Sequence, residues 1–375
     1  MKYDWIIIGG GASGLMLAAK KKVNKGIILE GGNALGSKLL LTGGGHCNIT
    51  HGGSIKDFIN CYGENGPAIR KLLYKHNNIE MIDFFNSRGL ETTEIDGCFY
   101  PASMKASDVL DFLVKEAKSN GWEFAMNAKV SSIKQNPGEK SWLVKADTTY
   151  LGEKVVIACG GVTYKNTGSD GSIFPIVESL GIEVVKPRSA LSSVDIKDYP
   201  YSDLAGISLS GVTVTAYSAS AGATCNGKAA RETGDLLFTH TGFSGPAILN
   251  ISRYCEAGEN ISISYNCELG DLPKRLQKAL EDRARGESGD IKTTKLDELL
   301  RSDSFIVSQV DSNGIVTAGG IALSEIDLSS MEIKKCPGLY AMGEVVDIDG
   351  KTGGYNLQFC YSSAMMIESF FLFKR

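Results

Sequence analysis

Residues 4–30, DWIIIGGGASGLMLAAKKKVNKGIILE, contain the clearest structural signal in this sequence. An apolar run at 5–8 is typical of a buried parallel strand. It leads into glycines with the spacing Gly9-x-Gly11-x-x-Gly14, and a helical pattern follows. A second apolar run ends on the acid Glu30. This order of strand, glycine turn, helix, strand and acid predicts a dinucleotide-binding βαβ unit.

Each part of this fingerprint has a physical role. The first glycine permits a tight turn, the second lets a pyrophosphate approach the backbone, and the third lets the helix pack on the strand. Free amide groups of the turn, which includes Ala12 and Ser13, and the helix dipole favour phosphates. Glu30 can accept hydrogen bonds from both ribose hydroxyls and would repel a 2′-phosphate, which favours FAD or NAD over NADP.

The composition is that of a globular enzyme, with 43% hydrophobic and 22% charged residues. At 375 residues, two or three domains are expected. A net charge of −4 argues against a nucleic-acid partner. Nine scattered cysteines without a CxxC, and four histidines, predict no metal site and suit a reducing cytoplasm. The start of the first strand close to Met1 leaves no room for a signal peptide, and we expect a cytoplasmic protein without a membrane span.

Two further glycine-rich segments suggest a ligand close to the backbone. Residues 31–50, GGNALGSKLLLTGGGHCNIT, begin at Gly31 and contain Gly43–Gly45, with Ser37, Lys38 and Thr42 as neighbouring donors. A flexible surface loop is the alternative interpretation. The apolar run at 155–158 ends on Gly160-Gly161, and the carboxyl end of a parallel strand is where an α/β sheet meets its ligand.

The rest of the chain predicts an α/β protein with an insertion. Helical periodicity covers 66–89, Ser107 is a candidate N-cap for a helix over 108–119, and 173–180 has a helical pattern. Strands are expected at 94–100, as a short strand or turn, and at 122–126, 130–134 and 142–146. Short β-prone segments at 194–196, 207–209, 212–216, 223–225 and 236–239 predict an inserted antiparallel sheet or barrel.

Charged helical patterns at 271–285 and 294–300 predict a small helical excursion within that insertion. Strand-like sequence returns at 305–310 and 314–318, and an apolar helix reaches about residue 373. The predicted domains are a discontinuous α/β domain at 1–188 and 315–375, an antiparallel β domain at 189–268 and 304–314, and a helical insert at 269–303.

A reductase with a second Rossmann unit for a nicotinamide cofactor would contain a second GxGxxG motif. This sequence does not contain one. Gly160-Gly161 and Gly353-Gly354 lack the spacing, and Gly319-Gly320 precedes sequence that is typical of a loop. The C-terminal segment 339–342, followed by Gly343-Glu344, resembles the strand and acid near the C-terminus of FAD enzymes of the glutathione-reductase type. A plain turn is the alternative. Together with the N-terminal fingerprint, this segment predicts FAD.

Four blocks are similar to bacterial flavoproteins of the aminoacetone oxidase family: KLLLTGGGHCNIT (38–50), LLFTHTGFSGPAILNIS (236–252), VTAGGIALSEID (316–327) and GLYAMGEVVDIDGKTGGYNLQFCYSS (338–363). That family includes proteins assigned to the reduction of unsaturated bile-acid intermediates. The resemblance implies a Rossmann-like FAD-binding domain of the glutathione-reductase type, an inserted β-barrel-like domain and a small helical sub-domain.

The resemblance also implies roles for single residues. Gly9, Gly11, Ser13 and Gly14 would hold the pyrophosphate and Glu30 the ribose, while Val130 would contact the adenine through its backbone. The path from pyrophosphate to flavin would be bordered by Lys38, Thr42 and Asn48, in the loop that holds Gly43. The ribityl side would be served by Gly343, Glu344 and Asp347, and the isoalloxazine by Gly354, Tyr355 and Asn356, next to Gly353.

Candidate catalytic residues each have a structural alternative. Lys351 precedes the TGGYN loop, where a cation near the flavin would stabilise an anion, but it can equally be a solvated lysine. Tyr355 can form a wall of the substrate pocket or pack in the core. His240 can act as an acid–base group or hold a structural hydrogen bond. Cys47 can be a redox thiol, although a packed small residue is the stronger interpretation.

Three functions follow. The first is an FAD oxidase that transfers a hydride from a small amine such as aminoacetone to flavin N5, with O2 as acceptor. The second is a reductase that takes hydride from NAD(P)H and saturates a C=C bond of a steroid-like or other hydrophobic substrate. The third is a flavin-holding protein without turnover, for instance a module associated with RNA or a partner protein. The oligomeric state does not follow from the sequence.

Overall fold

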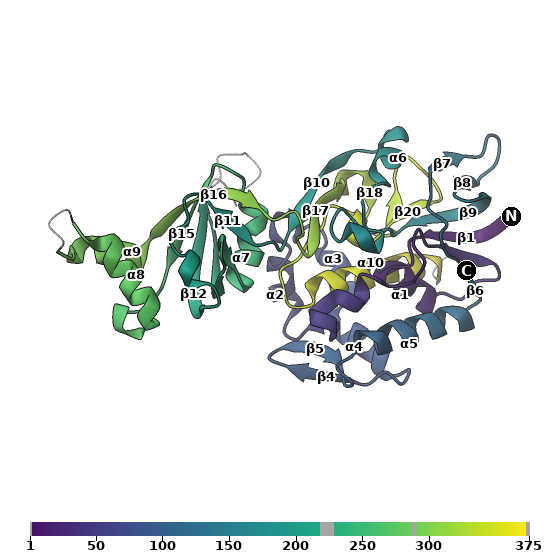
Figure 1. The fold of residues 1–375 in the computed structure, drawn as a ribbon. Helices are drawn as coiled ribbons and strands as arrows, with labels where there is room; N and C mark the ends of the chain where they lie inside the picture. Colours follow the sequence, from purple (N-terminus) through teal and green to yellow (C-terminus); the bar gives the residue numbers. More distant parts are fainter. Residues whose placement is uncertain (1, 218–228, 287–289, 373–375) are drawn as a thin grey trace. The chain divides into compact units, whose positions relative to one another are not determined.

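The computed structural model describes residues 2–217, 229–286 and 290–372. By its internal contacts the chain divides into two compact units. The first unit contains Met1–Arg188 and Val316–Arg375, and the second contains Ser189–Ile315 (Figure 1). Each unit is built around a hydrophobic cluster of its own.

The first unit contains a large sheet whose centre is the predicted βαβ unit. Its strand order is β18-β19-β20-β9-β1-β2-β6, with β8 paired to β9 and β7 to β8. The central pairs β1–β2, β1–β9, β2–β6 and β20–β9 are parallel. The strands are β1 (Lys2–Ile8), β2 (Gly26–Leu29), β6 (Trp122–Ala125), β7 (Ser132–Gln135), β8 (Trp142–Lys145), β9 (Thr149–Ile157), β18 (Ile326–Asp327), β19 (Glu332–Ile333) and β20 (Leu339–Ala341).

Residues 5–8, 27–29 and 155–157 are buried, because helices and loops cover a parallel sheet on both faces. Helix α1 (Ala12–Lys20) packs against both α5 (Ala106–Ser119) and α10 (Tyr355–Leu372), and the three lie together on one side of the sheet (Figure 1). The other helices of this unit are α2 (Ile55–Asn60), α3 (Arg70–Lys75), α4 (Asn78–Asn86) and α6 (Phe174–Ser179). A small antiparallel sheet, in the order β3-β5-β4, comprises β3 (Thr50–His51), β4 (Thr92–Ile95) and β5 (Cys98–Pro101).

Two sequence predictions are wrong in detail in this unit. The periodic stretch 66–89 forms two helices, because Asn77 accepts a hydrogen bond from the amide of Glu80 at 2.9 Å and starts α4 anew. Helix α5 begins at Ala106, so Ser107 is inside the helix and is not its N-cap. Gly319-Gly320 belongs to strand β17 (Val316–Ile321), which pairs with β10 (Val184–Ala190), and the short turn η7 (Leu323–Glu325) follows that strand.

The second unit contains a closed antiparallel barrel in the order β11-β14-β13-β12-β15-β16. Its strands are β11 (Val194–Ile196), β12 (Ser208–Tyr217), β13 (Ala230–Phe238), β14 (Gly242–Ser244), β15 (Asn260–Ser264) and β16 (Asp303–Val310). The segments 207–209 and 212–216, predicted as two strands, are one strand with a register shift between Leu209 and Val212, where Gly211 has a φ of +71°. The predicted strand at 223–225 lies outside the described residues.

Helices α7 (Pro246–Ile251), α8 (Lys274–Ala284) and α9 (Thr293–Arg301) belong to the same unit. The charged patterns at 271–285 and 294–300 are therefore helical, and α8 buries the apolar side chains of Leu276 and Leu280. None of the helices within the described residues is long and apolar enough to cross a membrane.

Candidate functional site

The glycine turn between β1 and α1 leaves open space in front of a helix N-terminus. A side chain on Gly14 would collide with the carbonyl oxygen of Gly9, so the third glycine lets α1 pack closely on β1. A Cβ on Gly11, by contrast, would meet no atom within 4 Å among the described residues. Gly11 is the N-cap of α1, and none of the described side chains caps this helix end. The amides of the first helical turn are therefore available to an anion.

Glu30 lies beside this turn, at the end of β2. It is 8% exposed, and its carboxylate accepts hydrogen bonds from the amides of Gly10 (2.8 Å) and Gly32 (2.7 Å). A carboxylate has about four lone-pair sites, so acceptor capacity remains for the two hydroxyls of a ribose. The amide of Ala128 donates to the carbonyl of Glu30 at 2.8 Å, which brings the segment containing Val130 alongside. The residues predicted for the adenosine half are thus neighbours in space.

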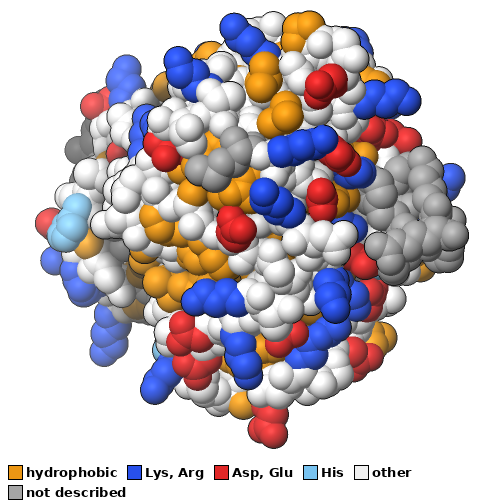
Figure 2. All heavy atoms as spheres, turned by 90° about the vertical axis from the view of Figure 1, so that its right-hand side faces the viewer, with side chains coloured by type: hydrophobic (Ala, Val, Ile, Leu, Met, Phe, Trp, Pro, Cys, Tyr) orange, Lys and Arg blue, Asp and Glu red, His pale blue; other side chains and the backbone are white. Residues whose placement is uncertain are grey.

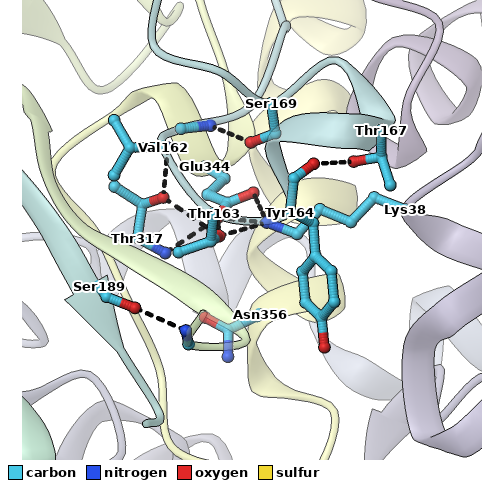
Figure 3. Close-up of polar contacts among 12 residues, drawn as sticks. Lys38, Val162, Thr163, Tyr164, Thr167, Ser169, Ser189, Thr317, Glu344 and Asn356 are labelled. Atoms are coloured by element: carbon cyan, nitrogen blue, oxygen red, sulfur yellow. Dashed lines mark hydrogen bonds and ion pairs between the residues drawn. The ribbon is translucent and has the colours of Figure 1, made fainter. Parts of the chain in front are cut away.

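A second group of residues is centred on Glu344, just after β20 (Figure 3). The Nζ of Lys38 lies 2.7 and 2.8 Å from the two carboxylate oxygens of Glu344 and 2.8 Å from the hydroxyl of Thr163. Glu344 Oε1 also accepts from the Thr163 hydroxyl at 3.2 Å and from the Thr317 amide at 2.9 Å. We name Lys38, Glu344, Thr163 and Thr317 the Lys38–Glu344 cluster.

The Lys38–Glu344 cluster adjoins the glycine turn. Gly343 has a φ of +69°, and a side chain there would collide with the hydroxyl of Ser13 in the first turn of α1. A Cβ on Gly160, which follows β9, would lie 2.7 Å from the hydroxyl of Ser169 and 3.6 Å from Glu344 Oε2. Gly161 donates its amide to the same serine at 2.8 Å and lies against Thr317. These glycines let three strand ends converge on one place, as expected where an α/β sheet meets its ligand.

The loop 42–48 and the start of α10 form a third group. Gly43, Gly44 and Gly45 have φ values of +56°, +64° and +92°, a left-handed run that favours glycine. The Thr42 hydroxyl donates to the carbonyl of Leu39 at 2.6 Å. The buried Oδ1 of Asn48 has no hydrogen-bond partner among the described residues, and it faces Gly354. A buried acceptor without a partner is costly, so it fits a site where a ligand donates.

The residues predicted for the isoalloxazine lie where a loop joins α10, with Gly353 and Gly354 in the loop and Tyr355 and Asn356 at the start of the helix. Asn356 uses its side chain to brace this loop, since its Oδ1 accepts from the Gly350 amide at 2.7 Å and its Nδ2 donates to the Gly350 carbonyl at 2.9 Å. Gly353 and Gly354 have φ values of +115° and +92°. The amide of Lys351 donates to the carbonyl of Cys61 at 2.9 Å, and the carbonyl of Asp347 accepts from Asn65 at 2.8 Å.

The predicted catalytic residues do not all belong to one unit. Lys351 and Tyr355 lie in the first unit, whereas His240 is exposed in the turn between β13 and β14 of the second. Burial raises the pKa of Tyr355 well above its usual value, so the phenol stays protonated. Burial also raises the pKa of Cys47 to about 11, so this thiol is not a thiolate near neutral pH.

Sequence reasoning missed His51, Thr163, Thr317 and Ser169. The ring of His51 stacks on Tyr355, with centroids 5.3 Å apart and an interplanar angle of 12°. A Cβ on Gly353 would lie 3.3 Å from that ring. A signal existed for Thr163, which follows the GG pair at 160–161, and for Thr317, which lies in the block VTAGGIALSEID (316–327).

The model of the HI0933-like protein Rossmann domain matches residues 3–369, almost the whole chain. The chain belongs to the HI0933-like family. It is an FAD-dependent oxidoreductase, and the predicted family, fold class, cofactor and enzyme class are confirmed. The residues described above fit FAD: Glu30 would hold the adenosine half, the uncapped end of α1 the diphosphate, and the region of Asn48 and Gly354 the flavin half.

Curated relatives of this HI0933-like protein align with almost its full length. The 3-dehydro-bile acid delta(4,6)-reductase of Clostridium scindens is 28% identical over 406 residues, covering 96% of this chain and 97% of the relative. The ribosomal RNA dihydrouridine synthase of Escherichia coli is 29% identical over 411 residues, covering 97% and 96%.

Solved structures share the fold of this family member. The 3-ketosteroid delta1-dehydrogenase of Sterolibacterium denitrificans aligns with a TM-score of 0.54 at 10% identity, covering all of both chains. The 3-ketosteroid-delta4-(5alpha)-dehydrogenase of Rhodococcus jostii aligns with a TM-score of 0.53 at 13% identity, covering 98% of this chain and 96% of that one. At these identities the likeness supports the architecture alone.

Proposed function

We propose that this flavoenzyme reduces a carbon–carbon double bond that is conjugated with a carbonyl group, using NAD(P)H as electron donor. The observation that carries this proposal is the shared chemistry of two relatives that match nearly full length at 28% and 29% identity. A 3-dehydro delta(4,6) bile acid contains a dienone, and uridine contains a double bond conjugated with a ring carbonyl. Both named reactions saturate such a bond, although the substrates differ greatly in size.

FAD, when bound, supplies the hydride chemistry that such a reduction requires. The protein must bind the carbonyl, exclude water and provide a proton for the second carbon. We assign the role of proton donor to His51, a residue of the first unit. Its Nδ1 lies 2.9 Å from the carbonyl oxygen of Gly52, which requires a proton on Nδ1 and leaves Nε2 as the position that exchanges a proton. Tyr355 holds the ring by stacking.

The charge distribution favours a small substrate over RNA. The net charge is −4, and Figure 2 shows lysine and arginine side chains interspersed with acidic ones on that face of the molecule, where a continuous basic field is not seen. Hydrophobic side chains are exposed between them. We therefore expect a hydrophobic enone to be the better hydride acceptor. The experiment described next also includes RNA as the alternative acceptor.

The test follows the absorbance of the oxidised flavin under anaerobic conditions. The yellow protein is mixed anaerobically with NADH or NADPH, which should bleach it. A 3-keto-delta(4,6) bile acid or an unmodified ribosomal RNA transcript is then added. Return of the colour, with a product heavier by two hydrogens in mass spectrometry, supports the proposal and identifies the acceptor.

Amine oxidation, the first function considered from the sequence, is the competing outcome. It has no counterpart among the relatives named above. Bleaching by aminoacetone but not by NAD(P)H, with peroxide formed on readmission of air, would overturn the reductase proposal. Bleaching by NAD(P)H without return of colour on either acceptor would exclude both acceptor classes. The variant His51→Gln should keep the bleaching step and lose most of the recolouring step.

A further inference from the structure

Glu344 carries its charge close to the place where the FAD diphosphate must bind. A side chain on the preceding residue, Gly343, would collide with the hydroxyl of Ser13 in the first turn of α1, the helix end to which we assign the diphosphate. A carboxylate so close to a dianionic group would oppose binding unless a cation compensated it. The cation present is Lys38, from a position 306 residues earlier in the chain.

All three donors of the Lys38 ammonium group are already used. They contact Glu344 Oε1 at 2.7 Å, Glu344 Oε2 at 2.8 Å and the Thr163 hydroxyl at 2.8 Å. An ammonium group has three N–H bonds, so this geometry leaves none for a phosphate oxygen. The Thr163 hydroxyl accepts from Lys38 and donates to Glu344 Oε1 at 3.2 Å, so its one proton is also directed at the carboxylate.

The surroundings keep this pair in place. The side chains of Lys38 and Glu344 are only 22% and 18% exposed, which weakens screening by solvent. The Thr317 amide holds Glu344 Oε1 at 2.9 Å, and the Thr317 hydroxyl accepts from the Val162 amide at 2.8 Å. The carboxylate therefore has fixed donors from β17, from the segment after β9 and from the loop that begins at Lys38 (Figure 3).

We infer that Lys38 supports FAD binding as a positioning residue, by cancelling and orienting the Glu344 carboxylate beside the diphosphate site, and not as a phosphate ligand. The resemblance placed Lys38 only along the path from pyrophosphate to flavin, and this assignment gives it a specific role there. It depends on FAD binding alone and is independent of the substrate proposed above.

The test is a double-mutant cycle on the full-length chain, with the dissociation constant of FAD measured by quenching of its fluorescence. Lys38→Met leaves an uncompensated carboxylate and should weaken FAD binding by about tenfold or more. Lys38→Met combined with Glu344→Gln removes both charges, and its affinity should return to within about threefold of Glu344→Gln alone. Added salt should improve the affinity of Lys38→Met, because it screens the repulsion.

Two outcomes would overturn the inference. A double variant as weak as Lys38→Met would show that Lys38 acts directly on FAD, and an unchanged affinity in Lys38→Met would show no role. Lys335→Met is the matched control, since Lys335 forms an ion pair of the same length, 2.7 Å, with Glu325 elsewhere in the unit. Should Lys38→Met fail to fold by circular dichroism, Lys38→Gln with and without Glu344→Gln gives the same comparison.

Discussion

The hydroxyl of Thr50 donates a hydrogen bond of 2.6 Å to Oε1 of Gln358, 308 residues away in the chain. Both residues are completely buried. The amide nitrogen of Gln358 donates to the carbonyl of His76 at 3.2 Å and to the hydroxyl of Ser362 at 2.9 Å. Helix α10 is thus fixed to β3 and to the end of α3 by polar contacts inside the core, next to the loop that holds Gly354.

Gln358→Leu should destabilise the protein by about 2–3 kcal/mol, because it leaves the Thr50 hydroxyl buried without a partner. The double variant Thr50→Val/Gln358→Leu should lose less than the sum of the single changes, since both partners are then apolar. Chemical denaturation of the FAD-loaded protein measures the free energies of unfolding. Strictly additive effects would contradict the coupling.

Gly11→Ala should lose FAD, whereas Gly14→Ala should lose stability. The space in front of Gly11 is open, so its variant should fold with normal circular dichroism but be purified colourless, because the methyl group occupies the approach of the diphosphate. Gly14→Ala pushes against the Gly9 carbonyl and should be destabilised by about 2 kcal/mol or more. A yellow Gly11→Ala protein would place the diphosphate elsewhere.

Glu30→Arg should abolish FAD binding, because it loses the acceptor for the ribose and the bonds from the Gly10 and Gly32 amides. The ratio of flavin to protein absorbance after purification is the measurement. Glu178→Arg, an exposed charge reversal on α6, is the control and should retain full colour. Normal FAD content in Glu30→Arg would refute the ribose assignment.

A buried ion pair should control the pH dependence of stability in the second unit. Asp303 is fully buried, and it accepts from Arg283 at 2.7 Å and from the hydroxyls of Tyr201 and Tyr265 at 2.6 and 2.9 Å. Burial raises the pKa of Asp303 above its usual value even with Arg283 present. Arg283→Met should raise it further and destabilise the unit by about 3–5 kcal/mol at neutral pH.

The sign of this pH effect follows from the raised pKa. The unfolded carboxyl, with a pKa of about 3.9, loses its proton before the folded one does. The stability of Arg283→Met should therefore fall as the pH rises from about 4 to the folded pKa, and the destabilisation should be smallest in acid. Thermal unfolding of Arg283→Met at several pH values measures this, with the exposed Arg301→Met as control. A pH-independent loss would mean that packing, and not the charge of Asp303, decides the effect.

The features that could be predicted from the amino-acid sequence are those encoded within short stretches of the chain. The run at 5–8, the glycine spacing and Glu30 specify a buried strand, a tight turn and an acceptor within one short stretch, so the dinucleotide site and the parallel sheet were predictable. Alternation and turn residues likewise predicted an antiparallel insertion. Boundaries were less predictable, because the side chain of Asn77 and the bulge at Gly211 override a periodic pattern.

Contacts between side chains far apart in the sequence became visible only in the folded protein. Lys38 and Glu344, Thr50 and Gln358, and His51 and Tyr355 are each separated by some 300 residues, and nothing in their local sequence indicates the partner. The order β20-β9-β1 places Gly343 against Ser13, and with it Glu344 beside the glycine turn. A charge acquires a role from the groups that surround it once solvent is excluded, and that environment exists only after the strands have paired.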